Sequence, residues 1–555
     1  MAEATSSSRN KIYALGVVGF LAILSILYYL AAPVYLYIVV YMWFGFLYGV
    51  LQQYGRFCFA SAWRDLIMVK VPRMFVGIMI GLMTLSIISA WLFVQYPAFY
   101  HPSPIGPHEL VGGLLFGLGM VFAGGCATGS LYKTGEGNMI SLTVLLSLSF
   151  AQAIFVALPF FDTWMSKLSV TGPNSITDTT DPNYIANVFH WPKWTLVEKI
   201  FPLTEDQVNQ GVHHSFWQNF VANSLLNTIV IAAILMIGVY IIVVRKNFLK
   251  RRKAAMTQSA DGGEVKMGFG DEVAGFWSMI SSSKRTTIAA VLLGIIAAIQ
   301  VFTMSWMRDN YDFGHPPYAQ GDPVEILNQT GNFGQVFALT NPNDPNSRPT
   351  ANKDAAPTSW PAADPGDVTK GGRMFDPGYW YITTQEAMFA GWIMNGVLPQ
   401  SITGDLKAPH VNEKVDPTTH EVVAPEPEQN GNRYFGNDNG LPKPWNSPAL
   451  LLSFGLILGA SFLALWNKEF KWKFPTRELF FYAVLGGTIM GIGSRIALGC
   501  NIGAFYTRAA FGSPGGWLFF IGMGAGAYIS AKAVNYLANK KMAKQMEDMD
   551  FDIEL

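Results

Sequence analysis

The sequence predicts an all-α polytopic membrane protein, built as an inverted-topology, pseudo-two-fold repeat with broken or re-entrant helices and about ten crossings. Only 14% of the 555 residues are charged, whereas soluble domains average about 25%. Several stretches of about 20 residues carry almost no charge, which is long enough to cross a bilayer. A third observation is an internal repeat, which places Cys126 and Cys500 in equivalent positions 374 residues apart.

The repeat comprises residues 112–132 and their copy, 486–506. Nine of the 21 positions are identical at one offset, including Cys126 with Cys500 and Tyr132 with Tyr506. Glycine-rich helices resemble one another because small residues let membrane helices pack closely. That similarity does not place a cysteine and a tyrosine in the same register. We therefore interpret the match as an internal duplication, which is a known way to build transporters.

In chain order, the sequence divides into membrane and polar parts. We expect a cytoplasmic N-terminus at 1–11, a first membrane repeat at 12–158, an outer loop at 159–218, a membrane helix pair at 219–306 with a basic cytoplasmic linker at 245–285, an outer insertion at 307–385, a second membrane repeat at 386–536 with an outer loop at 403–447, and a cytoplasmic tail at 537–555.

Two segments within the repeats are not expected to cross. The stretch 55–65 is too broken and too charged to span, and 386–402 is apolar but short. The first apolar run, 12–32, is about 20 residues long and has no small-residue cleavage site, so we read it as a spanning helix rather than a cleaved signal.

Lysine and arginine set the expected orientation. The clearest basic cluster is 245–253, which we place in the cytoplasm; the basic residues near both termini then fall inside as well. The first Gly-Cys segment enters the membrane from outside, after Glu109, and its copy enters from inside, after Glu478. The two copies therefore cross in opposite directions, and both bring a cysteine toward the middle of the bilayer.

The Gly-Cys-x-x-Gly pattern predicts a helix that breaks inside the membrane. Glycine leaves the helix at little steric cost, and an interrupted helix exposes backbone N–H groups that favour an anion. A cysteine thiol adds a weak donor without adding charge. The candidate substrate-binding residues are Cys58, Cys126, Cys500, Gly125, Gly129, Gly499, Gly503 and Asn501.

Simpler interpretations remain open for some of these residues. A free cysteine is often only a small buried hydrophobic residue, and an odd total of three argues against a disulfide framework. Four charged residues flank the breaks as supporting candidates, although ion pairing or an interfacial position is an equal alternative for some: Arg64, Lys133, Glu136 and Arg495. We expect no metal, no cofactor and no nucleic acid, because no ligand cluster, phosphate loop or dinucleotide fingerprint is present.

Three motifs together resemble the YeeE/YedE family of sulfur-compound transporters. They are Gly-Arg-Phe-Cys58-Phe-Ala-Ser-Ala-Trp-Arg-Asp, Gly-Cys126-Ala-Thr-Gly-Ser-Leu-Tyr-Lys-Thr-Gly-Glu-Gly-Asn and Gly-Ser-Arg-Ile-Ala-Leu-Gly-Cys500-Asn-Ile-Gly-Ala-Phe.

The resemblance implies an hourglass-shaped, non-enzymatic protein of the bacterial inner membrane that imports thiosulfate. The three functional cysteines of the family fall on Cys58, Cys126 and Cys500, with Cys126 as the central contact. It also implies a small TusA-type cytoplasmic sulfur carrier as a partner. The large outer loops, 159–218 and 307–447, depart from the short family members and suit a cap or an outer docking surface.

Other functions stay open at this stage. The chain is alternatively a non-transporting membrane subunit of a sulfur-metabolism complex, a transporter of another sulfur or selenium species, or an enzyme that forms a cysteine persulfide. Substitution of Cys126, a search for stoichiometric partners and mass spectrometry of the cysteines separate these hypotheses.

Overall fold

The structure is a computed structural model of the chain. It describes residues 2–31, 35–96, 100, 105–157, 194–204, 207, 212–259, 268–310, 383–397, 414–415, 422–423, 444–446 and 448–553. Most of the predicted outer regions 159–218, 307–385 and 403–447 lie outside these residues.

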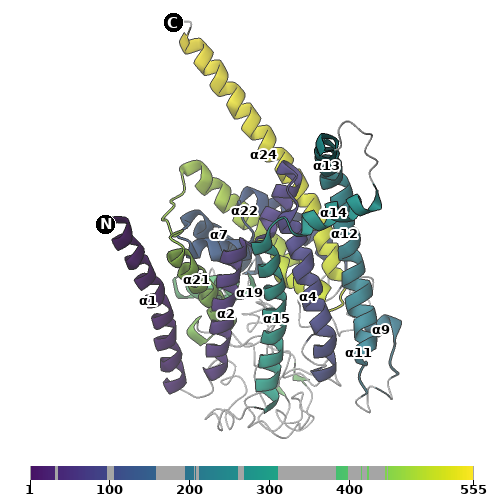
Figure 1. The fold of residues 1–555 in the computed structure, drawn as a ribbon. Coiled ribbons are helices and arrows are strands. Elements are labelled where there is room, and N and C mark those ends of the chain that lie inside the picture. The colour runs from purple at the N-terminus through teal and green to yellow at the C-terminus, as the bar shows by residue number, and fades with distance from the viewer. Residues whose placement is uncertain are drawn as a thin grey trace.

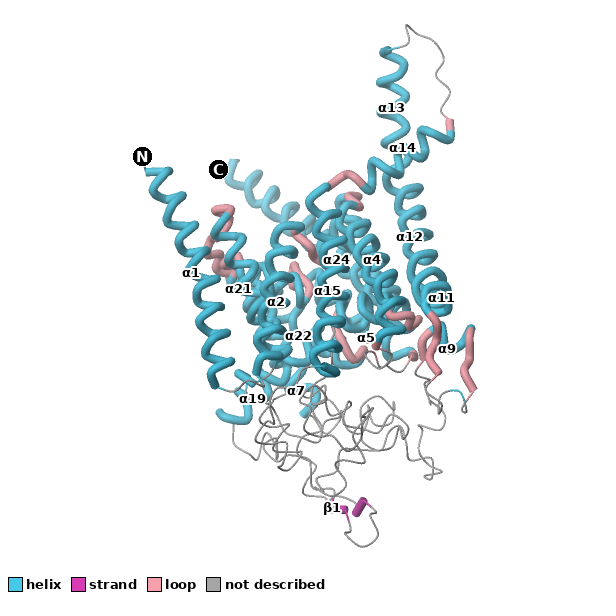
Figure 2. Tube along the Cα trace, turned by 60° about the horizontal axis from the view of Figure 1, so that its bottom comes forward, coloured by secondary structure: helices cyan, strands magenta, loops and turns pink. Residues whose placement is uncertain are grey.

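The described chain is helical apart from two strands of two residues each (Figure 2). The first repeat contains α1 Ala2–Ala31, α2 Leu36–Gly55, α3 Phe59–Arg64, η2 Asp65–Val69, α4 Arg73–Gln95, α5 Pro107–Phe122, α6 Ala127–Gly135 and α7 Met139–Ala157. The middle contains α9 Leu196–Ile200, α11 Phe216–Asn219, η5 Phe220–Val230, α12 Ile231–Val239, η6 Tyr240–Val244, α13 Arg245–Ser259, α14 Phe269–Ile280 and α15 Lys284–Asn310. The remainder contains α19 Thr383–Val397, β1 Lys414–Val415, β2 Val422–Val423, η10 Pro444–Asn446, α21 Pro448–Trp466, α22 Arg477–Ile496, η11 Asn501–Thr507, α23 Arg508–Ala510 and α24 Gly515–Ile553.

The all-α membrane class is confirmed. Within the described ranges, eight helical stretches are long and apolar enough to cross a bilayer, and α7 supplies a shorter apolar helix, Met139–Phe155. The structure adds detail to two predicted segments. The short apolar segment predicted at 386–402 overlaps α19, Thr383–Val397, and the predicted basic linker 245–285 contains two helices, α13 and α14.

Both chain ends, together with α13 and α14, lie at one end of the helix bundle (Figure 1). We call this the basic end, because it carries the lysines and arginines of residues 245–253. Helix α24 has 39 residues, which corresponds to about 58 Å of helix. It therefore exceeds the thickness of a bilayer and projects beyond the bundle at the basic end (Figure 1). That this end faces the cytoplasm stays a prediction.

Helices α5 and α22, which carry the two copies of the repeat, pack against each other in opposite directions. A methyl group added to Gly112 would lie 2.7 Å from the carbonyl oxygen of Gly493, and one added to Gly119 would lie 2.5 Å from that of Gly486. The later residue of α5, Gly119, thus contacts the earlier residue of α22, Gly486, so the two helices are antiparallel. Only glycine permits such a close approach of two backbones.

In the other helix contacts, a helix of one repeat packs against a helix of the other repeat. Gly113 of α5 lies against the backbone of Phe519 in α24. A methyl group added to its copy, Gly487 of α22, would lie 2.7 Å from the carbonyl oxygen of Val144 in α7. The pair α2 and α21 similarly matches the pair α15 and α4. This exchange of partners is what a pseudo-two-fold relation between the repeats requires.

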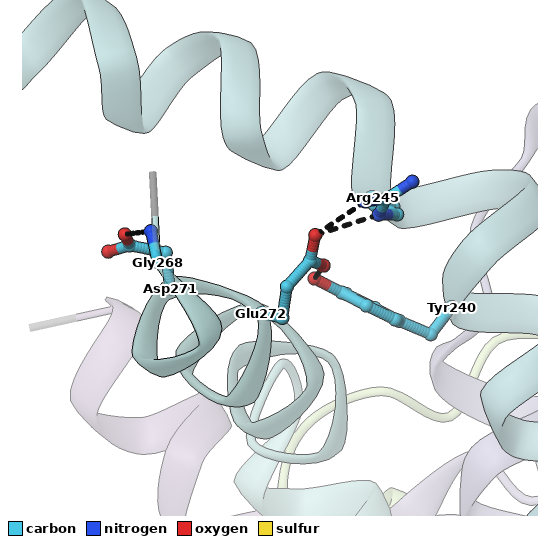
Figure 3. A network of polar contacts seen from close by, with 5 residues as sticks. All are labelled: Tyr240, Arg245, Gly268, Asp271 and Glu272. Atoms are coloured by element: carbon cyan, nitrogen blue, oxygen red, sulfur yellow. Dashed lines mark hydrogen bonds and ion pairs between the residues drawn. The ribbon is translucent and has the colours of Figure 1, made fainter. Parts of the chain in front are cut away.

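A polar network attaches α14 to the helix that leads into α13 (Figure 3). Glu272 accepts hydrogen bonds from Arg245 at 2.7 and 2.9 Å and from the Tyr240 hydroxyl at 2.8 Å. The bonds from Arg245, followed by that from Tyr240, lower the pKa of Glu272 from its ordinary value. Arg252 of α13 also pairs with Asp271 at 2.7 Å, so α13 and α14 form one unit at the basic end.

Candidate functional site

Each of the three cysteines follows a helix break with the same backbone conformation. In each case the residue two positions before the cysteine has a left-handed conformation, and the cysteine itself is extended and precedes a new helix. The pairs are Arg56 (φ 53°) with Cys58, Gly124 (φ 67°) with Cys126, and Leu498 (φ 55°) with Cys500. We call this arrangement the αL-x-Cys break.

The left-handed residue ends the preceding helix, which is a common way for helices to stop. Gly124 adopts this conformation at little cost, whereas Arg56 and Leu498 store backbone strain of about 1–3 kcal/mol each. Hydrogen bonds across the break offset this strain. The amide of Phe57 donates to the Gln52 carbonyl at 3.0 Å, and that of Gly499 donates to the Ser494 carbonyl at 2.8 Å.

Residues from all three breaks meet at a buried thiol, that of Cys126. The Cys58 and Cys126 sulfur atoms are 3.8 Å apart, and the Asn501 side chain donates to the Cys126 sulfur at 3.8 Å. The Gly129 amide also donates to this sulfur, at 3.3 Å. The four residues come from the first turns of α3, α6 and η11, so the N-terminal ends of three helical segments converge. These ends carry partial positive charge and unpaired N–H groups.

Gly129 and its copy Gly503 have different surroundings. A methyl group at Gly129 would collide with the sulfur of Cys58, whereas one at Gly503 would meet no atom of the described residues within 4 Å. Gly503 is also half-buried rather than buried. The Cys126 break is therefore filled by a thiol from another helix, and the Cys500 break has open space beside it within the described structure, one turn from Cys500.

A cation hydrogen-bonds the left-handed residue in both copies of the repeat. Lys133 donates to the carbonyl of Gly124 at 3.0 Å, and Arg508 donates to the carbonyl of Leu498 at 3.0 Å. Gly124 and Leu498 are equivalent at the offset of 374 residues. A cation at the C-terminal end of a helix stabilises its exposed carbonyl groups, so Lys133 and Arg508 hold the breaks in shape.

Arg508 also forms a buried ion pair with Glu109 at 2.6 Å, with both side chains at most 3% exposed. Glu109 lies at the start of α5 in the first repeat, and Arg508 follows η11 in the second. The pair therefore links the beginning of one copy to the break in the other.

Charged residues also surround the Cys58 break. Arg56 pairs with Glu136 and with Glu469, the latter at 2.9 Å, and is 48% exposed. Gln53 donates to Glu469 at 3.0 Å. Glu136 ends α6, and the following residues bond to the α21–α22 connection, with Met139 donating to the Lys473 carbonyl at 2.9 Å. This network joins α2, α6 and the segment after α21.

The remaining predicted residues have more local roles. Gly125 and Gly499 lie between the left-handed residue and the cysteine, where Gly499 has a φ of 156°. Arg64 pairs with its neighbour Asp65 at 3.0 Å. Arg495 is buried near the end of α22, just before the Cys500 break. Among the residues that the structure describes, no three His, Cys, Asp or Glu side chains gather as a metal site would require.

Sequence reasoning missed the partnership of Glu109 with Arg508 and the contribution of Glu469. The first two residues are 399 positions apart, and Glu469 lies in a basic connection that offers no local signal for a site. The one sequence feature that could have indicated this pair is charge, because Glu109 and Arg508 place a carboxylate and a guanidinium in otherwise apolar stretches.

The contact between Cys58 and Cys126 gives a direct test of this geometry. Their sulfur atoms are 3.8 Å apart, so a shift of about 2 Å brings them to disulfide distance. We expect a mild thiol oxidant to crosslink Cys58 to Cys126, as read from peptide masses without reduction. Cys58→Ser should abolish this crosslink. Recovery of both cysteines as free thiols from oxidised wild-type protein would contradict the geometry.

These features define a polytopic membrane protein whose broken helices meet at buried thiols. Comparison with known proteins agrees with this class. A family model described as "Sulphur transport" matches residues 54–204 and 426–529, which include all three αL-x-Cys breaks.

Individual proteins with similar sequences are also transporters by name. The thiosulfate transporter TsuA of Escherichia coli (strain K12) is 32% identical over 164 residues, 29% of this chain and 44% of that protein. TsuA of Spirochaeta thermophila is 41% identical over 95 residues, 17% of this chain and 28% of the relative. The probable transporter YedE of E. coli (strain K12) is 40% identical over 98 residues, 18% of this chain and 24% of the relative. The matches thus span less than half of each relative, and they confirm the resemblance to the YeeE/YedE family.

Proposed function

We propose that this chain transports thiosulfate, or a closely related sulfur oxyanion, along a path that passes the αL-x-Cys breaks. The contact of Cys58, Cys126 and Asn501 at one buried point carries the proposal. It places two weak S–H donors and an amide where three helical segments begin. Such a cluster offers donors and partial positive charge to an anion without presenting a full charge that would hold it too tightly.

The relatives support the choice of substrate. Two of the three similar proteins named above are thiosulfate transporters, and the residues that match the family model include the breaks. A soft thiol donor also suits the terminal sulfur of thiosulfate better than it suits an all-oxygen anion. Sulfite and other sulfur or selenium species remain the alternative substrates.

Open space beside Gly503 and the filled position at Gly129 suggest an order of contacts. The anion first enters the space near Cys500, then reaches the thiol of Cys126 and passes Cys58. It leaves near Arg56, a half-exposed cation held by two carboxylates. Import follows if the basic end faces the cytoplasm, as the lysine and arginine distribution predicts. A TusA-type sulfur carrier would then receive the anion at this end of the bundle.

Import of a dianion works against the membrane potential. Two negative charges moving toward an inside-negative compartment cost about 4.6 kcal/mol for each 100 mV. Without coupling, this corresponds to a concentration inside that is lower by roughly a thousandfold or more at equilibrium. The transported anion must therefore be consumed after entry, or its movement must be coupled to that of a cation.

Uptake of radiolabelled thiosulfate into proteoliposomes that contain only this chain tests the proposal. We expect uptake well above that of protein-free liposomes, with competition by unlabelled thiosulfate and much weaker competition by sulfate. Equal uptake by both kinds of vesicle, with folded protein inserted in the bilayer, would favour the non-transporting membrane subunit.

A further inference from the structure

Glu386, in the first turns of α19, carries a buried carboxyl group that the transport path described above does not use. The residue is only 6% exposed, and neither carboxyl oxygen has a hydrogen-bond partner among the described residues. The neighbouring polar group is Ser453 of α21, which does not form a hydrogen bond of normal geometry with it. In the same described part of the chain, the hydroxyl of Ser453 is also buried without a partner.

No cation pairs with Glu386 in the described part of the chain. Helix α19 packs against α7, α21 and α22. The sequences of α7 and α21 contain no Asp, Glu, Lys, Arg or His, and Glu386 is the sole titratable residue of α19. Helix α22 carries Arg477 and Glu478 in its first turn and Arg495 in its last turn.

This environment differs from that of Glu109, the other buried carboxyl group among the described residues. Glu109 is also buried, but it has Arg508 as a counter-ion at 2.6 Å. A carboxylate without such a partner is very unfavourable away from water, so we expect Glu386 to be the neutral acid in this conformation. It becomes charged only when a different conformation brings water to it. Ionisable residues of this kind within membrane proteins commonly mark ion or proton pathways.

We propose that Glu386 is a proton-binding site that couples proton entry to anion entry; this rests on the proposed function. The carboxylate takes up one proton when it is open to the outer side, is buried as the neutral acid, and releases the proton on the inner side. The step involves no redox change. One proton for each dianion halves the net charge that moves against the potential.

The position of α19 connects this site to the path. It packs against α22, the helix that precedes the αL-x-Cys break at Cys500, beside the open space at Gly503. A change in the charge of Glu386 therefore acts on the helix that shapes the proposed entrance.

Proteoliposomes that are more acidic outside than inside, with the membrane potential clamped at zero, test the site. We expect wild-type protein to accumulate thiosulfate above equilibrium and a protonophore to abolish this accumulation. Glu386→Gln mimics the protonated carboxyl group. It should lose gradient-driven accumulation at least tenfold, while exchange of labelled for unlabelled thiosulfate at equal pH continues. Glu478→Gln, an exposed carboxylate that pairs with Lys541, is the matched control and should accumulate like the wild type.

Each outcome separates the two proposals. Exchange by the wild type without any response to the proton gradient would overturn proton coupling and leave thiosulfate transport standing. Accumulation by Glu386→Gln at the wild-type level would overturn this site. Absence of exchange by wild-type protein would contradict the proposed function itself. If Glu386→Gln does not fold, two other measurements test the site. Glu386→Asp should retain coupling, and vesicles with wild-type protein should take up one proton with each anion. Anion entry without proton uptake would overturn the proposal.

Discussion

Cys126→Ala is expected to reduce thiosulfate uptake by about 10- to 150-fold, because a hydrogen bond to a charged partner contributes roughly 1.5–3 kcal/mol. Cys126 is fully buried where Cys58, Gly129 and Asn501 meet. Its removal deletes the central donor and leaves the Gly129 amide without its acceptor. Uptake into proteoliposomes at equal protein density, with thermal unfolding in detergent as a check on folding, measures the effect.

Cys126→Ser gives this experiment its mechanistic control. A hydroxyl group also donates a hydrogen bond, so transport by hydrogen bonding predicts that the serine variant keeps more uptake than the alanine variant. A mechanism that forms a persulfide on Cys126 predicts equal loss in both, because serine cannot carry the extra sulfur. Unchanged uptake in a well-folded alanine variant would show that the thiol is not on the path.

Breaking the ion pair between Glu109 and Arg508 should have the largest effect on stability. Both side chains are almost completely buried, so Arg508→Met leaves an uncompensated carboxylate and should destabilise the protein by about 3–5 kcal/mol. The same change removes the hydrogen bond to the Leu498 carbonyl, so uptake should fall as well. Thermal unfolding in detergent measures the first effect.

The double variant Glu109→Gln with Arg508→Met separates the two roles of Arg508. It removes both charges, so most of the lost stability should return, because a neutral pair is far less costly to bury. Uptake should remain low if the bond to Leu498 matters for the break. Lys541→Gln is the control, since its pair with Glu478 has the same length of 2.6 Å but both side chains are more than half exposed. This variant should unfold like the wild type; a loss as large as that of Arg508→Met would show that burial is not the cause.

The sequence was sufficient for the membrane class, and it displays the duplication that singles out the cysteines, whose role in transport stays a prediction. These features depend on composition, on apolar length and on the register of Cys126 with Cys500, all of which are properties of the linear chain. The opposite directions of α5 and α22 also follow from counting crossings, once the basic clusters are assigned to one side.

The shared backbone of the three breaks was not predictable from residue type. Arg56, Gly124 and Leu498 occupy the same position relative to a cysteine, yet two of them ordinarily avoid the left-handed conformation. That conformation accompanies the helix ends and, at Arg56 and Leu498, the hydrogen bonds that cross the break. The contact of Cys58 with Cys126 and the isolation of Glu386 likewise depend on packing between distant segments, which no local pattern records.

The glycine contacts between α5 and α22 also restrict how this protein can move. At Gly112 and Gly119 the two backbones approach so closely that a methyl group added to either glycine would lie within 2.7 Å of a carbonyl oxygen of the other helix. Closely packed interfaces shift between discrete arrangements rather than deform continuously. We therefore expect α5 and α22 to move together as one rigid unit, with any opening movement taken up at the αL-x-Cys breaks that follow the two helices.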